Sequence, residues 1–277
     1  MIILPLDPSK ARKKVRVGKP VKPSRSAEVA YRKGMLEQLK LQRGTATQLV
    51  QQMQQGASKA AVSAYLAKAV NASKHQFDEL AKRLAPQFVD GFSDEHRRRT
   101  ERMIASAFGV DWASITDEPE VRGELDLRII RNVELIESVG AKYWSDISQV
   151  VESSFAGTLE KPLIESIAEM GAKSRTQAKL IARDQTSKLA SSLNEVRQRS
   201  NGIDEYDWSN SKDIRVVGNP AGQYPKGNDK HGNHWKREGK RFSWSKPPHD
   251  GHPGQPILCR CTARPVIDLE KIKAQFV

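Results

Sequence analysis

Residues 26–200 carry a helical repeat of apolar side chains, and this pattern restricts the fold more than any other feature. Val62, Leu66, Ala69 and Phe77 recur near the helical period in a stretch rich in Ala, Leu and Lys. Leu189, Leu193 and Val196 repeat the pattern in a later segment. The mean hydropathy of −0.62 and the 29% of charged residues indicate long helices with a large solvated surface. The pattern therefore predicts an elongated helical region.

Residues that favour helix ends divide this region into several predicted helices. Ser93 followed by two acids predicts an N-terminal cap, and Gly109 a stop. Residues 123–155 read as one long helix or as two that meet near Gly140. Further boundary signals are Pro162 in a first turn, Gly171 past a helix end, the capping-box pair Ser174 and Gln177, and Asn201-Gly202 as a left-handed stop.

The chain changes character after Gly202. Tyr206 and Trp208 alternate within "EYDWS", so we expect them on one face of a strand, with Trp208 in the core. The runs "DIRVVG", "RFSW" and "ILCRCTARPVI" are also prone to form strands, and loops rich in Gly and Pro separate them. We predict an α+β protein: a mostly helical N-terminal region, then a small β-rich domain packed on the helix that ends near residue 200.

The net charge of +13 and the pI of about 9.7 point to a polyanionic partner. Residues 10–25 hold eight Lys and Arg residues and no acid, which predicts an extended arm. This arm is either a solvated tail or a segment that lies on nucleic acid or on an acidic protein surface, and we favour binding to DNA without sequence preference. The candidate DNA-binding residues are Lys10, Arg12, Lys13, Lys14, Arg16, Lys19, Lys22 and Arg25.

No run of about 18 apolar residues is present, so we expect no membrane span. The N-terminal apolar patch is short and precedes its positive charges, the reverse of a secretory signal. We therefore expect synthesis in the cytoplasm, with both cysteines reduced by default.

An ordered set of motifs in the last third of the chain resembles a known family. It consists of Ala182-Arg183-Asp184, Trp208, Ser211, Asp213, Arg215, His234, Gly239 and Cys259-Arg260-Cys261. The set is similar to the C-terminal domain of the Mu F-like minor head proteins of tailed phages, also called head morphogenesis proteins. In that family an "ARTE"-like turn precedes a strand, a His-containing strand follows, and "CRC" closes the domain. Here Asp184 and Gln185 replace the Thr and Glu of that turn, and His231 is additional.

The resemblance covers residues 165–267. Together with the charge and the helical pattern it predicts three parts: a basic arm (1–25), a helical region (26–160) and a Mu F-like α+β domain (161–270). It further implies a structural, non-enzymatic virion protein of capsid assembly, near the portal vertex inside the capsid and in the host cytoplasm during assembly. The implied partners are the portal protein and capsid or scaffold components, and the charge adds non-specific contact with packaged DNA.

Both cysteines and four of the six histidines lie between residues 231 and 261, which suggests a metal site. Zinc prefers thiolate and imidazole ligands, and Cys259 and Cys261 would share one face of an extended strand. The family pattern adds His234, and His252 stands in the loop before the cysteines. The candidate zinc ligands are thus His234, His252, Cys259 and Cys261. Two buried thiols without metal, or a disulfide, remain alternatives, because C-x-C is a weaker signal than C-x₂-C.

The same cluster allows a different class of function. His, Asn and Asp in "HGNHW" and "DGHP" are the materials of a metal-dependent nuclease, which would suit a basic protein. We keep a nuclease or effector as the alternative, and a free-standing DNA-binding protein as a third.

Overall fold

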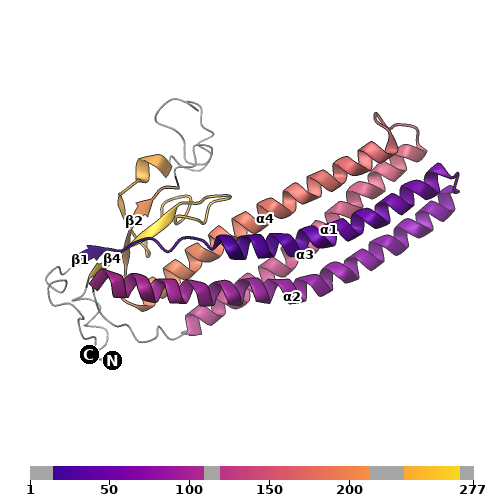
Figure 1. The fold of residues 1–277 in the computed structure, drawn as a ribbon. Helices are drawn as coiled ribbons and strands as arrows, with labels where there is room; N and C mark the ends of the chain where they lie inside the picture. The colour runs from indigo at the N-terminus through magenta and orange to yellow at the C-terminus, as the bar shows by residue number, and fades with distance from the viewer. Residues whose placement is uncertain (1–14, 109–118, 212–233, 269–277) are drawn as a thin grey trace. The chain divides into compact units, whose positions relative to one another are not determined.

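The structure is a computed structural model of the chain and describes residues 15–108, 119–211 and 234–268 (Figure 1). Four long helices are followed by most of a small antiparallel sheet, which confirms the predicted α+β class. The helices are α1 (Arg25–Gln54), α2 (Lys59–Phe108), α3 (Pro119–Phe155), α4 (Leu163–Ser200) and the short 3₁₀ helix η2 (His234–Arg237). The strands are β1 (Val15–Val17), β2 (Glu205–Ser209), β3 (Arg241–Ser243) and β4 (Thr262–Asp268). Among the described helices, none combines the length and apolar character needed to cross a bilayer.

Three of the predicted helix boundaries are wrong, because the helices continue through them. Ser93 lies inside α2, where its hydroxyl oxygen and its carbonyl accept hydrogen bonds from Arg197 at 2.7 and 3.0 Å. Gly171 and Ser174 both lie inside α4. Side chains that cap helices in isolation have here become part of the packed interior.

Other boundary predictions are confirmed. Helix α3 is continuous through Gly140, which was one of the two predicted forms. Helix α4 ends at Asn201-Gly202 as expected: Gly202 has a φ of 71°, and the N–H of Ile203 donates to the carbonyl of Gln198 at 2.8 Å. Gly109 lies outside the described residues.

The chain forms two compact units, each built from segments that are distant in the sequence. The helical unit comprises Ser26–Phe88 and Ile129–Ala182. The sheet unit comprises Met1–Arg25, Val89–Arg128 and Arg183–Val277. The three-part division predicted from the sequence, with boundaries at residues 25 and 160, stays a prediction.

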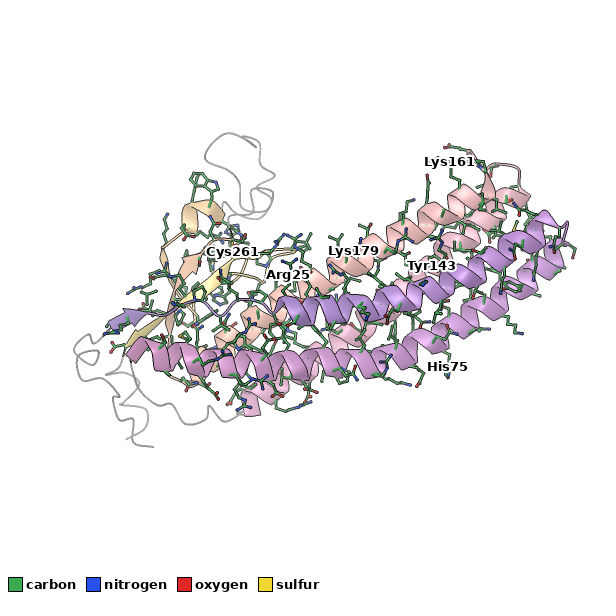
Figure 2. The ribbon with its side chains drawn as sticks, in the orientation of Figure 1. Arg25, His75, Tyr143, Lys161, Lys179 and Cys261 are labelled. Atoms are coloured by element: carbon green, nitrogen blue, oxygen red, sulfur yellow. The ribbon has the colours of Figure 1, made fainter. Side chains whose placement is uncertain are left out.

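The helical unit has a core of aromatic side chains with a few buried polar partners. The rings of Tyr31 and Phe88 stack at 4.2 Å. The indole N–H of Trp144 donates to Gln42 at 2.8 Å, so this buried polar atom has a partner. Tyr143, labelled in Figure 2, is also buried there, and burial raises its pKa to about 12.

The sheet unit contains four antiparallel strands in the order β1-β4-β2-β3. Strand β4 lies between β1 and β2, so a segment from each end of the chain meets in one sheet. Tyr206 and Trp208 are fully buried, as predicted, in a cluster with Trp244, Cys259, Cys261 and Ala263.

Three predictions about extended segments differ from the structure. Part of the predicted arm is a paired strand: Val15–Val17 forms β1 and pairs with Val266–Asp268 of β4. The last strand begins at Thr262, so Cys259 and Cys261 lie in the loop before it rather than on a strand. His234 stands in η2 rather than in the strand that the resemblance implied. The predicted strand at 213–218 lies outside the described residues.

Candidate functional site

The imidazole of His234 lies between the two cysteines. Its Nδ1 atom is 3.5 Å from the Cys259 sulfur and 3.6 Å from the Cys261 sulfur. Helix η2 supplies the histidine, and the loop before β4 supplies the thiols, one of which is labelled in Figure 2. All three side chains are buried. One potential ligand atom from each lies within 4.8 Å of the others, so these residues could hold a metal ion.

Unusual backbone conformations shape the loop that carries the thiols. Gly251, Gly254 and Leu258 have positive φ angles of 97°, 93° and 57°. At Gly254 an added Cβ would approach the carbonyl oxygen of Ser187 to 3.0 Å, so glycine is needed there. The Gly254 N–H points at the Cys259 sulfur at 3.4 Å. The loop therefore holds a backbone donor against the thiol.

A carboxylate orients the other side of the histidine ring. His234 Nε2 lies 2.9 Å from Asp250 Oδ2, and Arg237 donates to Asp250 Oδ1 at 2.7 Å. Burial raises the pKa of Asp250, but the hydrogen bonds from Arg237 and His234 outweigh it and leave that pKa lowered. An ionised carboxylate only accepts hydrogen bonds, so Nε2 carries its hydrogen and Nδ1 faces the sulfurs.

The thiols and the imidazole shift one another's protonation. The hydrogen bond between the cysteines lowers the pKa of Cys261, with help from His234. The same hydrogen bond, together with burial, raises the pKa of Cys259. Burial lowers the pKa of His234, but the hydrogen bonds to Cys261 and Asp250 raise it overall. The centre of the cluster thus favours a positive charge beside the sulfurs.

His252 does not join this group. Its Nδ1 atom lies 2.9 Å from the hydroxyl of Tyr206, and its ring packs at 4.8 Å from Trp244. Burial lowers its pKa. The structure therefore brings together His234, Cys259 and Cys261 of the predicted ligand set and leaves His252 as a core residue. His231 lies outside the described residues.

Burial also limits the chemistry of the cluster. His234 and Cys259 are 0% exposed and Cys261 is 2% exposed. A nucleophile or a base must reach its substrate to within hydrogen-bonding distance, and these atoms are covered. The arrangement is better suited to holding the sheet unit together than to catalysing bond cleavage.

The described part of the basic arm lies along α2. Arg16 donates to the carbonyl of Ala107 at 2.6 Å, and Arg99 donates to the carbonyl of Lys22 at 3.1 Å. Lys19, Lys22 and Arg25 are exposed, and Arg16 is half-buried. The other candidates, Lys10, Arg12, Lys13 and Lys14, lie outside the described residues. The structure thus joins the arm cations to the exposed Arg98 and Arg102 of α2 in one unit.

Sequence reasoning missed the supporting side chains. Asp250 orients His234, and Asp184 accepts a hydrogen bond from the Leu258 N–H at 2.8 Å, which ties the cysteine loop to α4. Asp184 belongs to the family motif Ala182-Arg183-Asp184, so the sequence marked its position but did not predict its role. Asp250 had only its place beside two histidines.

Comparison with known proteins agrees with the motif-based resemblance. Residues 146–264 match the family described as "Phage Mu protein F like protein". An uncharacterized protein of Haemophilus influenzae is 26% identical over 266 residues, which cover 92% of this chain. The chain spans 56% of the length of that relative. No solved structure matches the chain. The motifs and this match agree, so residues 146–264 are similar to the Mu F-like proteins of phage head morphogenesis.

Proposed function

We propose that the protein is a structural minor head protein of a tailed phage, built in near the portal during procapsid assembly and in contact with packaged DNA. The match of residues 146–264 to the Mu F-like family carries this proposal. That segment includes the end of α3, the whole of α4, the strands β2 and β3, and the cysteine loop. The helical unit would then be the surface available to the portal or the capsid lining.

Charge supports the contact with DNA. The chain has a net charge of +13, and exposed cations of residues 19–25 lie in the same unit as those of α2. Cations that neutralise phosphates release counterions and bind without regard to sequence, as a DNA-lining protein requires.

Assembly can be tested directly. The tagged chain is co-expressed with portal, scaffold and major capsid proteins, and the particles are sedimented and cross-linked. We expect the chain in the procapsid fractions at a fixed ratio to portal, with cross-links between the two. Shells assembled without portal serve as the control and should lack the chain. A chain that stays at the top of the gradient would contradict the proposal, and equal incorporation without portal would contradict the portal location.

The nuclease or effector interpretation has one observation in its favour, the His234–Asp250 pair beside two thiols. The burial of the cluster argues against it. Incubation of the purified chain with plasmid DNA and Mg²⁺, Mn²⁺ or Zn²⁺ separates the two functions: cleavage that is lost in a folded His234→Ala variant would favour the enzyme. A free-standing DNA-binding protein would bind DNA but fail to sediment with heads.

A further inference from the structure

We propose that His234, Cys259 and Cys261 bind one zinc ion that fixes the loop before β4 to η2. The inference is independent of the role in head assembly, since it concerns how the sheet unit is held together. It rests on the placement of three ligand atoms, on the groups behind them and on their burial.

The distances within the cluster fit a metal shell. Zinc binds imidazole nitrogen at about 2.0–2.1 Å and thiolate at about 2.3 Å, and a tetrahedral angle then separates nitrogen from sulfur by about 3.6 Å. The observed separations between His234 Nδ1 and the two sulfurs are 3.5 and 3.6 Å. Without a metal, the one hydrogen atom or lone pair on His234 Nδ1 would have to form hydrogen bonds with two sulfur atoms at once. One metal ion would contact all three ligand atoms.

The groups behind the ligands are those that metal sites use. A metal-bound histidine almost always donates its second ring N–H to a carboxylate or a carbonyl, which fixes the ring. Asp250 occupies that place at 2.9 Å and is itself held by Arg237. On the sulfur side, the Gly254 N–H stabilises negative charge on Cys259. Both ligand types are therefore oriented without the metal.

The chemistry of the ligands selects the ion and its role. Two thiolates and one imidazole suit zinc better than Mg²⁺ or Ca²⁺, which prefer oxygen ligands. Two thiolates with Zn²⁺ give a neutral centre, which a buried site tolerates far better than isolated thiolates. The ligands are 25 and 27 residues apart in the chain, so the ion would act as a cross-link in a small core. Among the described residues, these three side chains form the ligand set.

The decisive measurement is made on the full chain, purified with a tag that contains no histidine. We expect about one zinc per chain by elemental analysis, and zinc K-edge X-ray absorption with two sulfur neighbours and at least one nitrogen neighbour. Because this spectrum needs no variant, it stays valid even if ligand variants fail to fold. Protein without zinc that takes up none after reduction would overturn the proposal, and so would a Cys259–Cys261 disulfide in rapidly alkylated cell extracts.

Variants then assign the ligands. Cys259→Ser, Cys261→Ser and His234→Gln should each lower zinc content or affinity at least ~10-fold. Asp250→Asn should keep both sulfur neighbours and weaken zinc binding by about 10–100-fold, as expected of a positioning residue. His252→Gln and the exposed His75→Gln are the matched controls and should keep full zinc content. Equal loss in the His252 variant would overturn the ligand set.

Discussion

The guanidinium of Arg197 lies 3.0 Å from Nδ1 of His96, and both side chains are buried in the sheet unit. A guanidinium only donates hydrogen bonds, so Nδ1 accepts. The other ring nitrogen faces Asn194 Oδ1 at 3.2 Å and carries the hydrogen. Burial and then the charge of Arg197 lower the pKa of His96 to about 3.

Acid should therefore destabilise the protein through His96. The folded-state pKa lies below that of the unfolded chain, so the unfolded chain binds the extra proton. The free energy of unfolding should fall as the pH drops below about 6.5, by up to about 1.4 kcal/mol per pH unit. Urea denaturation of wild type and His96→Gln between pH 8 and pH 4.5 measures this contribution, with the shallower slope expected in the variant. Since burial also lowers the pKa of His252, some slope should remain. Parallel curves would refute the assignment.

Two helical glycines should respond oppositely to alanine. At Gly140 a Cβ would come within 2.3 Å of the Phe77 ring, so Gly140→Ala should destabilise the helical unit by about 1–3 kcal/mol through overpacking. At Gly44 nothing lies within 4 Å, and Gly44→Ala should stabilise by about 0.5–1 kcal/mol because alanine favours the helix. Thermal denaturation of both variants tests the pair. A stabilised Gly140 variant would mean that Phe77 moves aside freely.

Trp208→Ala should unfold or strongly loosen the sheet unit. The side chain is fully buried in a cluster of few large residues, and such truncations cost about 3–5 kcal/mol. Limited proteolysis followed by mass spectrometry locates the cleavage, which we expect within 183–268. Ile257→Ala is the control, since Ile257 is 62% exposed and its loss should leave the digestion pattern unchanged. Native resistance in the Trp208 variant would contradict its core role.

The exposed arm cations should contribute to DNA affinity beyond their effect on net charge. The triple variant Lys19→Ala, Lys22→Ala, Arg25→Ala should flatten the dependence of log affinity on log salt by about 0.9 per lost phosphate contact. Lys40→Ala, Lys68→Ala, Arg83→Ala removes the same charges from exposed positions of the helical unit. Equal slopes in the two variants would show that net charge alone acts. Point variants are required, because deletion of residues 1–25 would also remove β1.

The elements that local sequence determines were predictable. The stop at Asn201-Gly202 and the alternation of Tyr206 and Trp208 depend on backbone preference and strand period, and both are confirmed. The prediction for Ser93 was wrong because its hydroxyl, which would cap a helix in isolation, accepts a hydrogen bond from Arg197, a residue far away in the sequence. Strand β1 was missed because three residues flanked by cations carry almost no strand signal and gain their order from β4.

The candidate metal cluster could be predicted only in part, because residue type and family pattern identify some of its members and the fold decides the others. Cys259, Cys261 and His234 were identified from residue type and from the family pattern. His252 was chosen for its nearness in sequence, yet the fold turns it toward Tyr206. The approach of Asp250 to the far side of His234 depends on how η2 and the loop that carries Asp250 meet in the fold, so no local pattern could reveal it.

The pairing of Val15 with Asp268 has a consequence for biosynthesis. The ribosome makes β1 long before β4, because all four long helices and the strands β2 and β3 lie between them in the sequence, so β1 must wait for its partner. The helical hairpins can form during translation, because their contacts are closer along the chain, whereas the sheet can close only after its final strand has been made. Completion of the sheet would thus report that the ribosome has passed residue 268, and a chain terminated before β4 would leave β1 and β2 without that partner.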